Sequence, residues 1–233
     1  MVQLERALEA LRAGRPVAIL DDAGREGETD LHFAAQLATP ASIRALRVHA
    51  GGELYVAVSN AVATAFGIPF AGQALRAAAH EHPTLAALGK ETSSMCQGDC
   101  SVSLSFDHRS TKTGAPDVER SFTVRRFAEV KGHTAMRLRA WAHASLGERQ
   151  RRFVDTPPQL SEDVTSRTVS VPQAGRALGA EFHSPGHIFW CIEHPGGLRA
   201  RRGHTELAVA LARAAGEPRA CAADPRAHAA SCS

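Results

Sequence analysis

The sequence has no long apolar run, no basic leader segment and no regular spacing of its cysteines. Its apolar stretches fall well short of the ~18 to 20 residues that a membrane-spanning helix needs. Glu5, Arg6 and Glu9 interrupt the apolar pattern of the N-terminus, which is unlike a secretory signal. Five cysteines, an odd number, do not form a disulfide framework. We therefore expect a cytoplasmic protein without a membrane partner.

Aromatic residues and net charge are also scarce. Aromatic side chains make up 5% of the 233 residues, so alanine, valine and leucine must supply most of the core. The net charge of +3 is too small to require a nucleic-acid partner, although it permits an anionic ligand. RNA binding through the arginines of residues 137–152, with Trp141 and Phe153, is a weak alternative, because a short basic run is usually a solvated face. We expect no nucleic-acid partner.

Helical and strand-like hydrophobic patterns alternate along the chain. Apolar residues recur at helical spacing over residues 4–11, and a short apolar run over residues 17–20 predicts a buried strand. Thr39-Pro40 is typical of a helix start, and alternating apolar residues over 54–58 predict a half-buried strand. The alternation predicts a layered α/β (α+β) domain.

The second half of the chain is less regular. Strand patterns return over residues 102–106 and 188–192, but residues 132–180 show little periodicity and predict an irregular insertion. The last dozen residues are rich in alanine, arginine and proline and form no recognisable element, and they end an atypical tail over about residues 217–233. We interpret residues 1–233 as a single domain that contains this insertion and an atypical tail.

An acidic loop follows the first predicted strand. Glu26, Glu28 and Asp30 stand at alternate positions, so on an extended segment their side chains share one face. Three carboxylates on one face repel one another unless a cation or an arginine lies among them. Arg25 can serve in part, and a hard ion such as Mg²⁺ suits the oxygens better. A solvated acidic turn is the alternative.

A second motif begins at Arg201. Gly203 lets the backbone approach a ligand, and the N–H groups of a helix that starts here favour a phosphate. Thr205 adds a hydroxyl, and the guanidinium of Arg201 can bind phosphate oxygens in a forked geometry. His204 offers a neutral imidazole to a metal. A plain helix start with a threonine cap is the competing interpretation.

A third feature is a turn before the strand pattern of residues 188–192. Ser184-Pro185-Gly186 predicts the turn, which displays His187. A histidine in this position is either structural or catalytic, and the sequence pattern alone favours the structural role.

Together these segments resemble the 3,4-dihydroxy-2-butanone 4-phosphate synthase family, and its archaeal branch in particular. The resemblance covers about residues 1–130 and 180–215. It rests on four motifs in the family's order: Asp21-Asp22 with Arg25-Glu26-Gly27-Glu28-Thr29-Asp30, Thr113-Gly114 with Arg120, Ser184-Pro185-Gly186-His187, and Arg201 with Gly203-His204-Thr205-Glu206. Each motif is weak alone, and the acidic loop and the Gly-His-Thr-Glu motif are specific in combination.

The resemblance implies both a fold and an activity. The fold is a single three-layer αβα domain with a mixed, twisted sheet, which works as a homodimer with sites near the dimer interface. The activity is Mg²⁺-dependent conversion of ribulose 5-phosphate, the sugar-phosphate substrate, into formate and 3,4-dihydroxy-2-butanone 4-phosphate in riboflavin biosynthesis. Mn²⁺ is a candidate substitute for Mg²⁺.

The resemblance also implies roles for individual residues. Glu26 and His204 would hold the metal. The implied substrate-binding residues are Arg25, Glu26, Asp30, Thr113, Arg120, Arg201, Arg202, Gly203, His204 and Thr205, of which Arg201, Gly203 and Thr205 would bind the phosphate. The implied catalytic residues are His187, Asp21, Glu28, Glu206 and Asp224, with His187 and a late carboxylate moving protons.

The chain departs from the family at several positions. Tyr55 stands where the family usually has cysteine, Pro116 replaces a serine or threonine, and Glu119 replaces an aspartate. An ungapped reading from the second motif places Asp224 at the family's late functional glutamate. Pro225 follows it and argues against a central strand there.

Two hypotheses from different classes follow. The first is an active synthase. The second is a catalytically weakened relative that binds Mg²⁺ or a sugar phosphate, or acts as a structural partner. Because a shorter carboxylate on a poorly anchored tail would often miss the proton it must move, we expect turnover below the family's norm.

Overall fold

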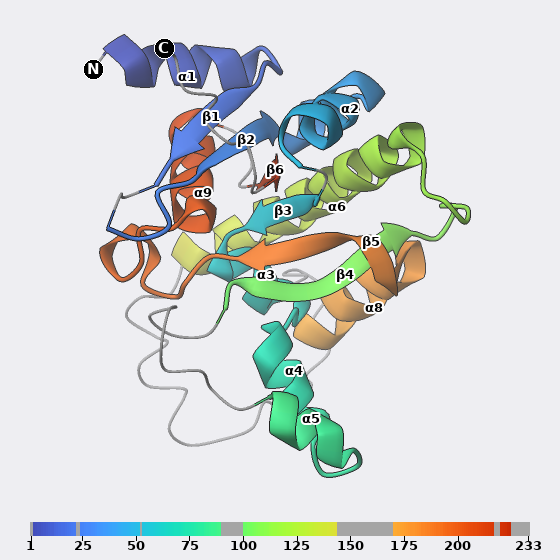
Figure 1. Ribbon diagram of the computed structural model, residues 1–233. Coiled ribbons are helices and arrows are strands. Elements are labelled where there is room, and N and C mark those ends of the chain that lie inside the picture. Colours follow the sequence, from blue (N-terminus) through green and yellow to red (C-terminus); the bar gives the residue numbers. More distant parts are fainter. Residues whose placement is uncertain are drawn as a thin grey trace.

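The computed structural model describes residues 2–21, 24–51, 53–89, 100–143, 170–216 and 220–224. Within them the strands form a six-stranded sheet in the order β1-β2-β6-β3-β5-β4 (Figure 1). β3 and β5 are parallel and the other pairs are antiparallel, so the sheet is mixed. The strands are β1 Val17–Leu20, β2 Thr29–Ala34, β3 Tyr55–Val58, β4 Val102–His108, β5 Phe182–Ile192 and β6 Ala220–Asp224.

Helices connect and cover these strands. They are α1 Val2–Arg12, α2 Pro40–His49, α3 Asn60–Phe66, α4 Ala71–Ala78, α5 Pro83–Leu88, α6 Asp117–His143, α8 Val171–Glu181 and α9 His204–Ala214, with short 3₁₀ turns at Ala35–Leu37 and Gly197–Arg199. The predicted start of α2 is confirmed: Thr39 caps the helix, Pro40 takes the first position, and Thr39 and Ser42 form a reciprocal capping box. In the described part of the chain, no helix is both long and apolar enough to cross a membrane.

One side of the sheet, the core face, carries the main apolar core. Directly opposed residues of paired strands point to the same side of a sheet, and this side presents, among others, Val56, Ile188 and Trp190. Helices α2, α3, α6 and α8 contribute buried residues to the same cluster. Burial of this apolar surface is the main stabilising contribution to the fold.

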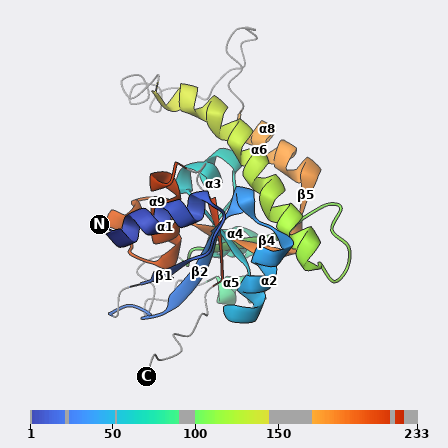
Figure 2. The same cartoon turned by 90° about the horizontal axis from the view of Figure 1, so that it is seen from above.

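The other side, the site face, carries smaller and more polar residues. Asp30, His32, Tyr55 and Ala57 lie on it, and the buried residues of α9 pack against Ala57. Helix α1 in turn packs on α9 and β1. Figure 2 shows α1 and α9 on one side of the sheet and α6 and α8 on the other. The αβα layering expected from the sequence is therefore correct.

The expectation of an irregular insertion over residues 132–180 is wrong at both of its ends. Helix α6 continues to His143, and α8 begins at Val171. A capping box between Ser170 and Gln173 starts α8, and this signal is legible in the sequence. The remaining part of the predicted insertion, residues 144–169, lies outside the described residues.

The expectation that the tail forms no strand is also wrong. β6 lies inside the sheet, where Asp224 is opposite Leu31 of β2, and Ala223 is opposite both His32 of β2 and Tyr55 of β3. The strand ends at Asp224, the residue before Pro225. Its hydrogen bonds therefore need no backbone N–H group from a proline. The backbone of β6 is therefore held from both sides up to Ala223, and that of Asp224 from the β2 side.

Candidate active site

A cavity of about 180 Å³ opens on the site face, between the β1–β2 loop and the start of α9. The acidic loop supplies one wall and the second motif supplies another. The lining residues are Arg25, Glu26, Asp30, His32, Tyr55, Ala57, Cys100, Ser101, Val102, Cys191, Arg201, His204 and Thr205. Two of the predicted motifs, about 175 residues apart in the chain, therefore meet in one place.

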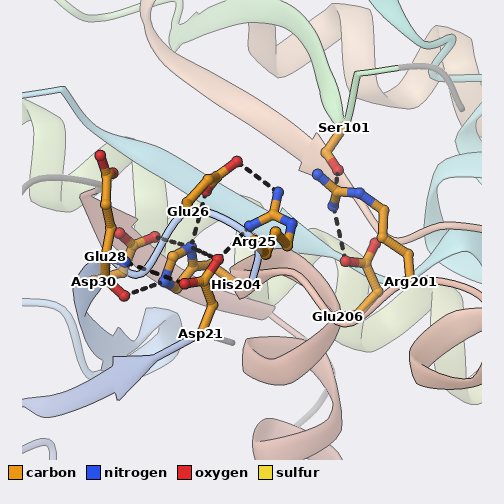
Figure 3. Close-up of polar contacts among 9 residues, drawn as sticks. All are labelled: Asp21, Arg25, Glu26, Glu28, Asp30, Ser101, Arg201, His204 and Glu206. Atoms are coloured by element: carbon orange, nitrogen blue, oxygen red, sulfur yellow. Dashed lines mark hydrogen bonds and ion pairs between the residues drawn. The ribbon is translucent and has the colours of Figure 1, made fainter. Parts of the chain in front are cut away.

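His204, the first residue of α9, lies at the centre of the acidic loop (Figure 3). Its Nε2 lies 3.0 Å from the backbone oxygen of Glu28, which can only accept, so Nε2 must donate. Its Nδ1 faces the carboxylates of Asp30 (3.6 Å), Glu26 (3.7 Å) and Asp21 (4.0 Å). In neutral imidazole that Nδ1 carries a lone pair, which the three carboxylates repel unless a cation lies among them.

The donor atoms of this cluster have the right chemistry for a divalent ion. One ligand atom each from Asp21, Glu26 and His204 lies within 4.8 Å of the other two. Carboxylate oxygens with one imidazole nitrogen fit a divalent cation. The structure thus brings together Glu26 and His204, the two residues expected to share a metal, and adds Asp21 to them.

Glu28 departs from the expected arrangement. Its side chain is exposed, and it contacts His204 only through its backbone carbonyl. The prediction of three carboxylates on one face assumed an extended segment, but Gly27 adopts a left-handed conformation with φ of +63°. The alternation therefore breaks between Glu26 and Glu28, and only Glu26 and Asp30 of the three face His204.

Asp21, which is buried, and Arg25, which is partly exposed, form an ion pair. The Nη1 of Arg25 donates to Asp21 at 2.6 Å, and its Nη2 lies 2.7 Å from Glu26. The backbone N–H of Glu28 also donates to Asp21 at 3.1 Å. Burial alone would raise the pKa of Asp21, but the hydrogen bond from Arg25, the charge of His204 and the Glu28 amide hold that pKa below its usual value. Asp21 is therefore ionised at neutral pH.

Arg201 is held in place by Glu206. The fully buried carboxylate of Glu206 accepts from Arg201 Nη1 at 2.8 Å and from the backbone N–H of His194 at 2.9 Å. Arg201 also donates to the hydroxyl of Ser101 at 2.6 Å. Glu206, expected to be catalytic, does not line the cavity, and its contacts are those of a residue that orients Arg201. Arg202 is exposed and lies outside the cavity.

Gly203 leaves room for two arginine side chains at the start of α9. A Cβ there would lie 2.9 Å from Arg201 Nη1 and 3.1 Å from the guanidinium carbon of Arg25. The two arginines therefore approach each other over a residue without a side chain. Gly203 is the N-cap of the helix and no side chain caps it, so the interpretation as a threonine-capped helix start is wrong. The N–H groups of this helix end stay available to an anion.

Other predicted site residues lie elsewhere. His187, Thr113 and Arg120 do not line the cavity. Thr113 is exposed, and Arg120 donates to the carbonyl of Ala115 at 2.7 Å. Asp224 ends β6, opposite a residue of β2.

His32 also lines the cavity, although none of the predicted motifs includes it. Its side chain is buried, and neither ring nitrogen has a hydrogen-bond partner within the described residues. Because strand residues alternate, its spacing of two from Asp30 places both on the same face, and this signal could have identified it. Tyr55 also lines the cavity; its hydroxyl donates to Glu53 at 2.9 Å and its ring lies 5.7 Å from that of Phe189.

Comparisons with known proteins match most of the chain. The sequence model of the family described as 3,4-dihydroxy-2-butanone 4-phosphate synthase matches residues 5–224. The chain is 34% identical to the 3,4-dihydroxy-2-butanone 4-phosphate synthase of Methanosarcina mazei, over 91% of this chain and 72% of the relative. It is 30% identical to the riboflavin biosynthesis protein RibBA of Bacillus subtilis, over 92% of this chain and 38% of the relative.

A solved structure supports the fold independently. A 3,4-dihydroxy-2-butanone 4-phosphate synthase in complex with two magnesium ions superposes with a TM-score of 0.61 at 22% identity, over 96% of this chain and 74% of that chain. The family match is also longer than the motifs suggested. It runs through residues 132–180 and reaches the end of β6.

Proposed function

The chain belongs to the 3,4-dihydroxy-2-butanone 4-phosphate synthase family, and from this premise we propose that it converts ribulose 5-phosphate into formate and 3,4-dihydroxy-2-butanone 4-phosphate. The product is a precursor in riboflavin biosynthesis. One observation carries the proposal: the ligand atoms of Asp21, Glu26 and His204 converge beside Arg201 at the N-terminus of α9. A site for a divalent ion thus adjoins a site for a phosphate.

Mg²⁺ is the proposed metal, with Mn²⁺ as a substitute. Glu26 and His204 hold it, and Asp21 is close enough to join them. When bound, the ion withdraws electron density from the sugar oxygens and so makes proton removal from the neighbouring carbon easier. The carboxylate and imidazole chemistry of these three residues fits such an ion.

The substrate is oriented by residues on either side of the metal ligands. Arg201, Thr205 and the first N–H groups of α9 bind the phosphate, because a helix N-terminus and a guanidinium both favour an anion. Arg25 and Asp30 contact the sugar hydroxyls. Glu206 does not touch the substrate and instead keeps Arg201 in position through its buried ion pair.

We propose that a second copy of the chain completes each site. His187 is the expected proton-transfer residue, yet it does not line the cavity formed by its own chain. A homodimer with its sites near the interface would supply His187 to the partner's cavity. Mixing Glu26→Gln and His187→Ala chains tests this, since each mixed dimer holds one intact site and regains activity. Recovery that never exceeds the activity of the two separate variants would contradict the dimer.

Formate release decides between the active synthase and the weakened relative. Ribulose 5-phosphate labelled with ¹³C at the carbon that is lost should give labelled formate in the presence of Mg²⁺, and the Glu26→Gln variant should give none. Unchanged substrate, with Mg²⁺ and phosphate still bound, would instead support the weakened relative. Because β6 is paired on both sides, poor anchoring of the Asp224 backbone no longer argues for low turnover. The shorter side chain of Asp224 is the remaining reason for that expectation.

A further inference from the structure

His187 lies in a bulge of β5 that packs against β4. Phe106 is opposite Ile188, whereas the next residue, Asp107, is opposite His183, so four residues of β5 loop out between these two pairs. The backbone N–H of Gly186 donates to the hydroxyl of Ser105 at 3.0 Å. The bulge is therefore fixed to the neighbouring strand and is not a free turn.

Gly186 allows this close approach. A Cβ at Gly186 would lie 2.1 Å from the carbonyl carbon of Phe106 and 2.4 Å from the backbone nitrogen of Asp107, distances that no side chain can adopt. The missing side chain lets the bulge rest on the backbone of β4. The next residue, His187, consequently lies over the side chain of Asp107.

Asp107 and His187 form a hydrogen-bonded pair of unequal exposure. The Asp107 Oδ2 lies 2.5 Å from the Nδ1 of His187, and the side chains are 2% and 45% exposed, respectively. An ionised carboxylate only accepts, so Nδ1 donates and Nε2 is left with its lone pair toward solvent. Arg120 is near enough for its charge to interact with that of Asp107.

We propose that Asp107 is the positioning residue of His187. It fixes the imidazole ring and selects the tautomer protonated at Nδ1, so that Nε2 is presented as a base. Nε2 then takes a proton from the substrate, the electrons of the broken bond stay on the substrate, and the buried carboxylate stabilises the imidazolium until the proton is returned. No oxidant or reductant is needed. The proposal rests on the proposed function, which assigns proton transfer to His187.

A double-mutant cycle on formate release tests the coupling. Asp107→Asn should lower kcat roughly 10- to 100-fold, a range typical of residues that orient a functional histidine, while KM changes less than about threefold. In a His187→Ala background the same substitution should change kcat less than about twofold. The matched control is Asp117→Asn, which removes the ion pair with Arg47 and should leave kcat unchanged. An equal loss in both backgrounds would overturn the proposal.

The tautomer of His187 supplies a readout that needs no activity. Long-range ¹H–¹⁵N spectra of the wild-type chain, assigned with His187→Ala, should show neutral His187 protonated at Nδ1. Asp107→Asn should shift the neutral form toward protonation at Nε2. A wild-type His187 protonated at Nε2 would overturn the proposal even if Asp107→Asn does not fold. Conversely, a chain with the Nδ1 tautomer that releases no formate would contradict the proposed function and leave the pairing intact.

Discussion

The two faces of the sheet use the same strands for different purposes. On the core face the rings of Phe106 and Trp190 stack at 3.9 Å, and Phe127 and Phe182 surround them. On the site face the same sheet presents charged and polar groups around a cavity. Because side chains alternate along a strand, residues that stabilise the core and residues that face the cavity follow one another in the sequence. Substitutions on one face should therefore affect stability, and substitutions on the other should affect ligand binding.

The largest expected effect is on the core face. Phe106→Ala removes a fully buried ring from the aromatic cluster and should lower the free energy of unfolding by about 3 to 5 kcal/mol. The matched control is Phe122→Ala, whose ring is 39% exposed and should cost less than about 1 kcal/mol. Urea titration measures both. Equal losses would mean that the cluster is not the centre of stability.

The next effect concerns the phosphate. Arg201→Lys keeps a positive charge beside the buried Glu206 but loses the forked donor, so ribulose 5-phosphate should bind about tenfold more weakly. Arg201→Ala is a poorer test, because it leaves a buried carboxylate without its partner and destabilises the fold. Arg202→Lys, one residue away and exposed, should change the affinity less than about twofold. Equal weakening by the two lysine variants would indicate a diffuse basic surface.

The third prediction concerns His32, a residue of the site face that should affect stability. Burial, together with the charge of His204, lowers the pKa of His32 to about 3. The contribution of neutral His32 to the free energy of unfolding is therefore complete above 6.5, the pKa of histidine in the unfolded chain. It falls as the pH drops below that value, because only the unfolded chain takes up the proton. Between pH 7 and pH 5 this effect amounts to about 2 kcal/mol.

Denaturation of the metal-free protein at the two pH values tests this. His32→Leu should flatten the pH dependence by about that amount, whereas the exposed His82→Leu should not. An unchanged slope in the His32 variant would show that this imidazole is protonated or hydrated within the fold.

Local patterns predicted most of the layered fold. Strands over 17–20 and 54–58, the capped start of α2 and the helix after Gly203 all follow from periodicity and caps. The central position of β6 could not be predicted, because its short alanine-rich run has little intrinsic strand preference. Its strand character comes from pairing with β2 and β3, which is a tertiary effect.

The candidate site, too, could be predicted from the sequence only in part. The motifs predicted which residues of the acidic loop and of α9 should meet, and the cavity brings most of them together. The exposed side chain of Glu28 could not be predicted, because it depends on the left-handed Gly27. The role of Glu206 beneath Arg201, and of Asp107 beneath His187, depends on contacts between distant strands and helices that no local pattern records.

Calorimetric titration of Mg²⁺ into the wild-type chain and two variants tests the central claim most directly, namely that one corner of the site face is a metal centre. Glu26→Gln and His204→Ala should each weaken Mg²⁺ binding roughly tenfold or more, since each removes a ligand. Glu26→Gln should leave the urea midpoint nearly unchanged, because Glu26 is exposed; Glu9→Gln on α1 is the control. Equal Mg²⁺ affinity in wild type and both variants would contradict the claim.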